Sequence, residues 1–314
     1  MTCKETATLL REQDGILILT HKRPDGDTLG CGVALCHALR QLGKTAWLLP
    51  NPDASALFTP YLEGVWAPED FAPAFVVTVD TASLGLLPDN AKSYRDRIDL
   101  AIDHHPSHEG FGKHSLVEAD KAACGEILFE LIRELTSLTP QIALPLYLAV
   151  STDTGCFVYS NTTGNTHRVA AALMETGIDW KGVNKRHFRT KTVKRLRMEA
   201  MLLDSMELYE EGTVAVASVT MDMVNKLHAT TEDLEDIAAF LGQVEGVRHS
   251  VTIREREDGG CKVSVRTAAD LNASAVCALL GGGGHAAAAG CALDENPART
   301  EELVLAAIRQ VKYG

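Results

Sequence analysis

The chain has 314 residues, of which 46% are hydrophobic and 23% are charged, and this balance is typical of an ordinary globular protein rather than a disordered or fibrous one. Its length favours two domains over a single core. The net charge of −12 argues against a protein that tracks along duplex DNA, because such proteins neutralise phosphates with a basic face. A polyanionic substrate would therefore be short and held at a local positive site, such as bound metal ions.

No sequence feature indicates a membrane or an oxidising compartment. No apolar run reaches the roughly 18 residues of a membrane span, and the first residues lack the apolar region of a signal peptide. The eight cysteines include no CxxC pair, and Cys31, Cys36, Cys124 and Cys277 lie in apolar patterns that indicate small buried side chains. We therefore expect a cytoplasmic protein with no disulfides and no membrane partner.

The first half of the chain alternates short apolar strands with helical stretches. Strands are expected near 15–20, 45–49, 75–79 and 98–102. Helices are expected near 28–42, 123–137 and 141–151, with Gly43 ending the first of them. This alternation predicts an α/β fold in which helices cover both faces of a parallel sheet.

The pattern becomes mostly helical from about 165 to 205, and a second, smaller α/β unit begins near Gly212. Its strands are expected at 213–217, 247–257 and 261–267, the last two joined by a hairpin turn at Asp258-Gly259-Gly260. Its helices are expected at 233–241, 273–280 and 298–311.

The helical stretch in the middle of the chain carries a cluster of basic residues. They are Lys181, Lys185, Arg186, Arg189, Lys191, Lys194, Arg195 and Arg197. Charge runs of this kind are usually a solvated face, and that is the preferred interpretation. The alternative is a positive wall that draws anionic substrates towards the protein.

Carboxylates and histidines follow the ends of apolar strands and helices at four places in the first half. In chain order these are His21-Lys22-Arg23-Pro24-Asp25-Gly26-Asp27, Asp80, Asp103-His104-His105 and Asp153. The carboxyl ends of parallel strands share one edge of a sheet, where ligands bind, so these residues can meet. Because clustered like charges repel, two divalent cations would relieve the repulsion and also activate a water.

Each of these motifs also has a plainer interpretation. Asp27 could cap a helix that begins at Thr28, and Asp80 and Asp153 could be caps or turn residues. Asp103-His104-His105 could be no more than a polar strand end. In the metal-binding interpretation, adjacent residues at a strand end point in different directions, so one histidine binds metal while its neighbour faces the substrate. The aspartate before them would orient an imidazole.

A glycine-rich loop is the strongest signal in the second half. Gly281-Gly282-Gly283-Gly284-His285 leaves backbone N–H groups unshielded, so that a phosphate or a base can approach closely. The alanine-rich residues 286–290 are expected to begin a helix, whose N-terminus would add positive charge. Arg266, at the end of a strand, could clamp a phosphate with two hydrogen bonds. The plainer interpretations are a flexible linker and a surface arginine.

Taken as an ordered set, from about Gly15 to Gly290, these motifs resemble the DHH/DHHA1 phosphoesterase family, and within it the bacterial nanoRNase/pAp-phosphatase group. The resemblance implies a metal-binding DHH domain over 1–188, a helical linker over 189–211 and a smaller α/β DHHA1 domain over 212–314 that binds substrate across a cleft. It also implies a hydrolase with two Mn²⁺ ions, or Mg²⁺ in their place. Its substrates would be short oligoribonucleotides, cleaved to mononucleotides, or pAp, converted to AMP.

The resemblance also implies roles for individual residues. The first metal would be bound by His21 and Asp25, the second by Asp27, His104 and Asp153, and both by Asp80. His105 would contact the scissile phosphate, with Asp103 behind it. The far end of the nucleotide would be held by Arg266, Gly282, Gly283, Gly284 and His285. A homodimer is compatible with the resemblance, and the cleavage polarity stays open.

Three other functions compete with this one. A soluble phosphodiesterase for cyclic di-AMP or pApA would keep the chemistry and change the substrate. A non-catalytic nucleic-acid-binding module is suggested by the glycine-rich domain, which resembles one appended to alanyl-tRNA synthetase, but the complete ligand set and the acidic charge argue against it. A family II inorganic pyrophosphatase shares the metal domain, but its second domain lacks the glycine–histidine loop.

Overall fold

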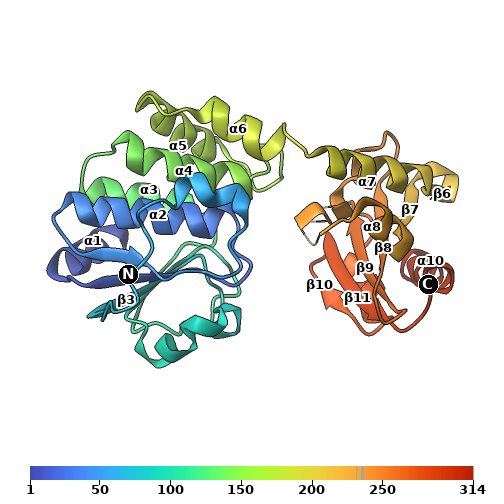
Figure 1. Cartoon of the computed structure of the whole chain (residues 1–314), viewed down its shortest axis with the longest axis horizontal. Coiled ribbons are helices and arrows are strands. Elements are labelled where there is room, and N and C mark those ends of the chain that lie inside the picture. Colours follow the sequence, from blue (N-terminus) through green and yellow to red (C-terminus); the bar gives the residue numbers. More distant parts are fainter. Residues whose placement is uncertain (231, 235–236, 314) are drawn as a thin grey trace. The chain divides into compact units, whose positions relative to one another are not determined.

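The computed structural model describes residues 1–230, 232–234 and 237–313. The chain divides into two compact units, Met1–Thr190 (unit 1) and Lys191–Gly314 (unit 2) (Figure 1). No helix among the described residues is long and apolar enough to cross a membrane.

Unit 1, all of whose residues are described, is built on a five-stranded parallel sheet in the order β2-β1-β3-β4-β5, which confirms the predicted fold class. The strands are β1 (Ile16–Leu19), β2 (Ala46–Leu48), β3 (Phe75–Val79), β4 (Leu100–Asp103) and β5 (His114–Val117). The last strand was not predicted from the sequence. Every residue of β1 and β3 is buried, as expected for strands that are covered on both faces.

Helices cover the two faces of this sheet unequally. The α-helices are α1 (Cys3–Glu12), α2 (Gly26–Gln41), α3 (Cys124–Leu135), α4 (Pro140–Asp153), α5 (Gly164–Glu175) and α6 (Trp180–Phe188), and the 3-10 helices are η1 (Ala56–Tyr61), η2 (Leu84–Leu86) and η3 (Asp89–Arg97). Helices α2, α3 and α4 pack on the face that carries Ile16 and Ile18 (Figure 1). The opposite face, with Leu17 and Leu19, is covered by the segment that contains η2 and η3.

Helix α2 begins two residues before the predicted start at 28. Asp25 is its N-cap, because the Asp25 carboxylate accepts hydrogen bonds from the backbone N–H groups of Asp27 (3.0 Å) and Thr28 (3.2 Å). The interpretation of Asp27 as the cap of this helix is therefore wrong. At the other end, Gly43 follows the helix with a φ of +79°, as its role of helix stop requires.

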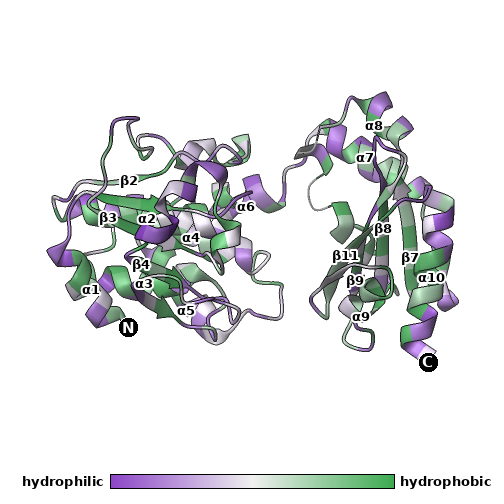
Figure 2. Ribbon diagram, turned by 90° about the horizontal axis from the view of Figure 1, so that it is seen from below, coloured by the Kyte–Doolittle hydropathy of each residue, from purple (hydrophilic) through white to green (hydrophobic). Residues whose placement is uncertain are grey.

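Unit 2 contains a mixed sheet whose described strands run in the order β10-β11-β9-β8-β7-β6. The strands are β6 (Glu207–Tyr209), β7 (Val214–Val219), β8 (His249–Glu255), β9 (Cys261–Thr267), β10 (Gly283–Gly284) and β11 (Ala288–Leu293). The helices are α7 (Val193–Asp204), α8 (Met221–Leu227), α9 (Ala273–Ala278) and α10 (Pro297–Tyr313). Residues of α9 and α10 pack on one sheet face and residues of α7 and α8 on the other, so the apolar strands lie in the middle (Figure 2).

Two predictions for unit 2 need correction. Of the helix expected over 233–241, residues 235 and 236 lie outside the described residues, and the described part forms short 3-10 helices (η5, Glu232–Leu234; η6, Ile237–Ala239; η7, Leu241–Gln243) instead of an α-helix. The helix expected after His285 is wrong, because this segment forms strand β11, paired with β9. Tertiary context overrides the helix propensity of alanine here, since Ala289 and Cys291 place alternate side chains in the core.

Glycines allow α2 and α4 to lie unusually close together. A Cβ atom added to Gly30 would lie closer than 3.0 Å to the carbonyl oxygen of Pro145, and one added to Gly26 would lie equally close to the Thr152 side chain. Interiors are packed too densely to absorb such an atom. The contact fixes the start of α2, with Asp25 and Asp27, beside the end of α4, with Asp153.

We predict that Gly30→Ala lowers the free energy of unfolding by about 1–3 kcal/mol, because the added methyl group forces α2 away from α4. The matched control is Gly164→Ala in the exposed first turn of α5, where the nearest atom to a new Cβ lies at 3.6 Å. This change should alter stability by no more than about 0.5 kcal/mol. Urea unfolding of both variants makes the comparison, and equal effects would contradict the close-packing argument.

Candidate metal centre

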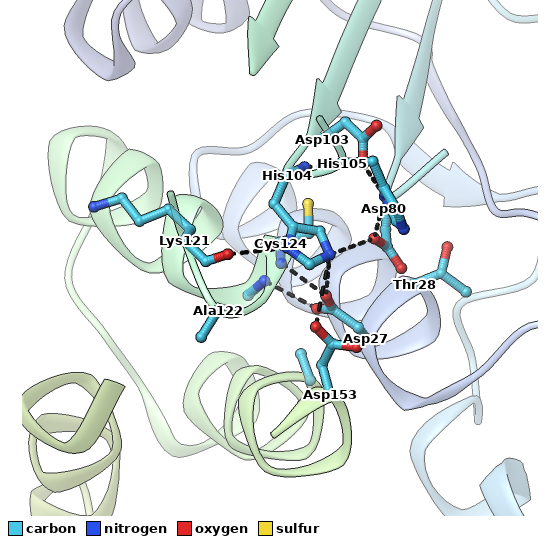
Figure 3. Close-up of polar contacts among 12 residues, drawn as sticks. Asp27, Thr28, Asp80, Asp103, His104, His105, Lys121, Ala122, Cys124 and Asp153 are labelled. Carbon is cyan, nitrogen blue, oxygen red and sulfur yellow. Dashed lines mark hydrogen bonds and ion pairs between the residues drawn. The ribbon is translucent and has the colours of Figure 1, made fainter. Parts of the chain in front are cut away.

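The four N-terminal motifs meet at the carboxyl edge of the sheet in unit 1. The Nε2 atom of His104 lies 3.8 Å from Asp27 Oδ2, 3.5 Å from Asp80 Oδ1 and 3.6 Å from Asp153 Oδ2 (Figure 3). These residues come from the start of α2, the end of β3, the end of β4 and the last turn of α4. The parallel arrangement of the strands brings these residues to one edge of the sheet, as the sequence predicts.

A second group of side chains adjoins the first and shares Asp80 with it. The Nε2 atom of His21 lies 3.7 Å from both Asp25 Oδ1 and Asp80 Oδ2. Asp80 therefore turns one carboxylate oxygen towards His104 and the other towards His21. The candidate ligand atoms in each group lie within 4.8 Å of one another, and the groups are His21/Asp25/Asp80, Asp27/His104/Asp153 and Asp80/His104/His105.

Asp80 is strained and unsatisfied in a way that fits a cation. Its φ of +52° lies in the left-handed region, which costs free energy for a residue other than glycine. The backbone N–H of Asp80 donates to Ile102 O at 2.8 Å and so holds the turn on the neighbouring strand. The Oδ1 atom is buried without a hydrogen-bond partner among the described residues. A buried carboxylate oxygen of this kind is completed by a positive ligand.

Asp27 is held by the N-terminus of a different helix from its own. Its buried carboxylate accepts hydrogen bonds from the backbone N–H groups of Cys124 (2.7 Å) and Gly125 (2.9 Å), which begin α3. Free N–H groups and the helix dipole stabilise an anion there. Burial and the charges of Asp80 and Asp153 nevertheless raise the pKa of Asp27 well above its usual range.

The remaining charges show that the centre carries an excess of negative charge. Burial, together with the charges of Asp80 and Asp25, raises the pKa of Asp153 to about 6. Burial alone would lower the pKa of His21, but the carboxylates of Asp25 and Asp80 outweigh it and raise this pKa to about 10. Such a cluster either takes up protons or binds cations.

Both central imidazoles are oriented through their second nitrogen. His104 Nδ1 contacts Lys121 O at 3.1 Å, and His21 Nδ1 contacts Lys22 O at 2.9 Å. On the neutral ring, a carbonyl acceptor fixes the proton on Nδ1, so that the Nε2 lone pair is directed into the centre. Nε2 is the nitrogen that lies near the carboxylates in both histidines.

Asp103 and His105 lie beside the centre. The fully buried Asp103 carboxylate accepts hydrogen bonds from His105 Nδ1 (2.7 Å) and His108 Nδ1 (2.9 Å). Burial would raise the pKa of Asp103, but these two hydrogen bonds outweigh it and hold the pKa below its usual range. His105 is half-exposed and its Nδ1 is engaged, so its Nε2 can reach a ligand. Sequence reasoning did not identify His108.

Two asparagines that sequence reasoning did not assign to the site support its backbone. Asn161 Nδ2 donates to Asp153 O (3.1 Å) and to Ala122 O (2.9 Å), and these two hydrogen bonds tie the end of α4 to the segment before α3. Asn51 Nδ2 donates to His21 O at 2.9 Å. No local pattern marks these asparagines, because their partners are distant in sequence.

In unit 2, the predicted substrate-binding residues lie at one end of the sheet. Arg266 on β9 pairs with Ala288 on β11, next to the turn in which the backbone N–H of His285 donates to Ala288 O (2.8 Å). Gly283, Gly284 and His285 are exposed, and a Cβ at Gly282 would collide with Cys291. The structure therefore brings Arg266 and the glycine loop together, without the helix end that was expected beside them.

The basic cluster of the helical stretch is partly neutralised within unit 2. Lys191 and Arg195 both contact the Glu199 carboxylate, at 2.9 and 2.8 Å, and Lys194 contacts Asp233 at 3.2 Å. These ion pairs weaken the alternative of a positive wall, but Arg195 and Glu199 are mostly buried, so this part of the cluster is not the solvated face that was preferred from the sequence.

Comparison with known proteins agrees with these observations. The DHH family N-terminal domain matches residues 15–150 and the DHHA1 domain matches residues 211–312. The bifunctional oligoribonuclease and PAP phosphatase NrnA of Thermus thermophilus is 33% identical, over 97% of this chain and 92% of its own length. The cyclic-di-AMP phosphodiesterase GdpP of Geobacillus thermodenitrificans is 28% identical, over 88% of this chain and 44% of its own length.

A solved structure shares the fold. The crystal structure of an exopolyphosphatase-related protein from Bacteroides fragilis superposes with a TM-score of 0.88, over 99% of this chain and 96% of the other, at 22% sequence identity. With two matching domains and a relative that is similar along nearly its whole length, this chain belongs to the DHH family, with a DHHA1 domain in its second half.

Proposed function

We propose that this protein is a metal-dependent phosphoesterase that hydrolyses short oligoribonucleotides to mononucleotides and pAp to AMP. The observation that carries the proposal is Asp80, whose two carboxylate oxygens face two separate groups of ligand atoms. Support for the substrate comes from the relative in Thermus thermophilus, a bifunctional oligoribonuclease and PAP phosphatase that matches both domains. The acidic net charge suits a short substrate held at a local positive centre.

The residues present fit two divalent cations. His21 and Asp25 would hold one ion, Asp27, His104 and Asp153 the other, and Asp80 would bridge them. Carboxylates with one imidazole at each ion suit Mn²⁺, with Mg²⁺ as the alternative that oxygen ligands also accept. Asp80 Oδ1, which is buried and accepts no hydrogen bond from the described residues, supports this fit. When bound, the ions would lower the pKa of a water and neutralise phosphate charge.

His105 would act on the substrate rather than on a metal. Asp103 engages its Nδ1 atom and orients the ring, which leaves Nε2 to donate a hydrogen bond to the scissile phosphate. The buried Asp103 charge also favours the protonated ring, because its hydrogen bond raises the pKa of His105. His105 would thereby stabilise negative charge as it develops on the phosphate.

The second domain would hold the rest of the substrate. Arg266 would bind a phosphate, and Gly282, Gly283, Gly284 and His285 would offer exposed backbone to the far nucleotide. We place the catalytic domain at 1–188, the linker at 189–211 and the substrate-binding domain at 212–314. Helix α7 lies within this linker, and its Met198 and Leu202 are buried in a cluster of unit 2.

We predict that Mn²⁺ raises the unfolding temperature of the metal-free protein. We also predict that Asp153→Asn stabilises the metal-free protein but reduces the further stabilisation that Mn²⁺ provides. Without metal at pH 8, the variant should be more stable by on the order of 1 kcal/mol, since one repelling charge is lost. The stabilisation by Mn²⁺ should shrink, since one ligand is lost. Thermal unfolding with and without Mn²⁺ measures both effects.

The matched control for this experiment is Asp70→Asn, which removes an exposed carboxylate of unit 1 outside the candidate centre. It should leave the stabilisation by Mn²⁺ unchanged. The assignment of Asp153 as a ligand fails if Mn²⁺ stabilises Asp153→Asn as strongly as the unmodified protein.

We predict that Asp80→Asn reduces hydrolysis at least about 1,000-fold, because it weakens both ion sites, whereas His105→Gln reduces it about 100- to 10,000-fold with both ions retained. Asparagine keeps the shape of aspartate and tolerates a positive φ, so the first variant should fold. Steady-state kinetics and Mn²⁺ titration by calorimetry test the pair. Loss of an ion in His105→Gln would make His105 a ligand, and substantial activity of Asp80→Asn would overturn the function.

A cyclic di-AMP or pApA phosphodiesterase is the second candidate, because the relative from Geobacillus thermodenitrificans is a cyclic-di-AMP phosphodiesterase. With Mn²⁺ present, we expect a higher kcat/KM on pAp and on di- to pentaribonucleotides than on cyclic di-AMP or pApA. Rates measured side by side on these substrates decide the matter. A preference for cyclic di-AMP or pApA would favour the second candidate, and no turnover of any of them would favour a binding module.

A further inference from the structure

Two pockets lie side by side on unit 1, next to the loop that carries the first motif. One has a volume of about 670 Å³ and the other about 400 Å³, both within the range of small-molecule sites. Pro52 lines both of them, so the pockets adjoin. The larger pocket is mainly apolar and the smaller one is charged, and neither contains a candidate metal ligand.

The charged pocket holds more cationic than anionic side chains. Lys22, Lys92 and Arg95 line it, together with the carboxylates of Asp53 and Asp89. Asp89 pairs with Lys92 at 2.5 Å. In a chain with a net charge of −12, a pocket with surplus positive charge favours an anionic ligand.

Arg95 brings an unsatisfied hydrogen-bond donor to this pocket. Its Nε atom is buried and has no hydrogen-bond acceptor within the part of the chain that the structure describes. A buried donor without an acceptor costs free energy, and a phosphate oxygen would satisfy it with a charge-assisted hydrogen bond. The nearby Asp53 carboxylate instead accepts from the backbone N–H of Arg23 at 3.0 Å.

The apolar pocket has the composition of a site for a nucleobase. Trp66, Leu62 and several prolines form its walls. An aromatic side chain offers a stacking surface for any base, worth about 1–3 kcal/mol per base. Asn90 also lines this pocket and follows Asp89 of the charged pocket, and its Nδ2 donates to Pro50 O at 2.6 Å. The pockets therefore meet at Pro52 and at Asp89–Asn90, an arrangement that suits a single nucleotide with its base in the apolar pocket and its phosphate in the charged one.

Both pockets are joined to the candidate metal centre through one loop. Lys22 lines the charged pocket and directly follows His21, whose imidazole lies beside Asp25 and Asp80. Asn51 lines the apolar pocket and donates to His21 O. A chain of nucleotides with its scissile phosphate at the centre could place the next nucleotide in the pockets.

We propose that the two pockets form a nucleotide-binding subsite in unit 1, with the base beside Trp66 and the phosphate beside Lys92 and Arg95. The proposal rests on the function proposed above in one respect, that the nucleotide belongs to an oligoribonucleotide substrate. It implies that the nucleotides beyond the scissile phosphate bind to unit 1. The same chemistry would also suit a free nucleotide that regulates the enzyme, and the experiment separates these two sources.

The test compares kcat/KM for a pentaribonucleotide and for pAp in Lys92→Ala, in Arg95→Ala and in the double variant. The pentaribonucleotide-to-pAp ratio should fall about tenfold in the double variant, mainly through KM, as expected for loss of two phosphate contacts. Lys113→Ala is the matched control, because Lys113 also pairs with an aspartate, Asp99 at 2.7 Å, but lines neither pocket. An unchanged ratio in all variants, or an equal fall in Lys113→Ala, overturns the substrate subsite.

Binding of AMP to the metal-free full chain, measured by calorimetry, separates this proposal from the proposed function. If the unmodified chain hydrolyses none of the substrates but AMP binds more weakly to Lys92→Ala, the nucleotide-binding pockets are supported and the proposed hydrolase function is overturned. If the unmodified chain hydrolyses the pentaribonucleotide, and the variants change neither AMP binding nor the pentaribonucleotide-to-pAp ratio, only the proposed subsite is overturned. If AMP alters pAp hydrolysis in the unmodified chain but not in the double variant, with the ratio unchanged, the ligand is a free nucleotide and the substrate assignment is wrong.

Discussion

Three carboxylates of unit 1, those of Asp27, Asp80 and Asp153, lie within 3.8 Å of one imidazole nitrogen of His104. In a buried place this arrangement is electrostatically unfavourable, because like charges repel strongly where water is excluded. The fold maintains it by attaching each carboxylate to rigid structure. Asp27 is held by the first N–H groups of α3, and Asp80 by a strained turn that is hydrogen-bonded to the adjacent strand.

The packing of helices determines how closely these charges approach. Helices α2 and α4 come together at Gly26 and Gly30, where no larger side chain fits. The carboxylate of Asp153 at the end of α4 therefore lies beside the start of α2, which carries Asp25 and Asp27. A feature of the hydrophobic core thus sets the geometry of the charged centre. The energy of apolar burial in these helices opposes the repulsion among the carboxylates.

Sequence reasoning reached the sheet and the ligand candidates because both depend on local patterns. The apolar runs before Asp80 and Asp103 mark two strands in the sequence, and parallel topology then brings the ends of these strands together. The anchoring of Asp27 could not be predicted, since its partner Cys124 lies 97 residues away. Strand β11 was missed for a related reason, because its alanines favour a helix until β9 offers an edge to pair with.

The contrast between Asp80 and Asp103 shows how a candidate metal ligand differs from a carboxylate whose charge the protein already compensates. Both are buried aspartates at the ends of neighbouring strands, and their sequence contexts are alike. Asp103 accepts hydrogen bonds from two imidazoles, so its charge is compensated within the protein. Asp80 keeps an oxygen that accepts no hydrogen bond from the described residues. The Asp80 oxygen without a hydrogen bond has more free energy to gain from a cation than the Asp103 carboxylate has, and this difference favours Asp80 as the proposed bridge between two ions.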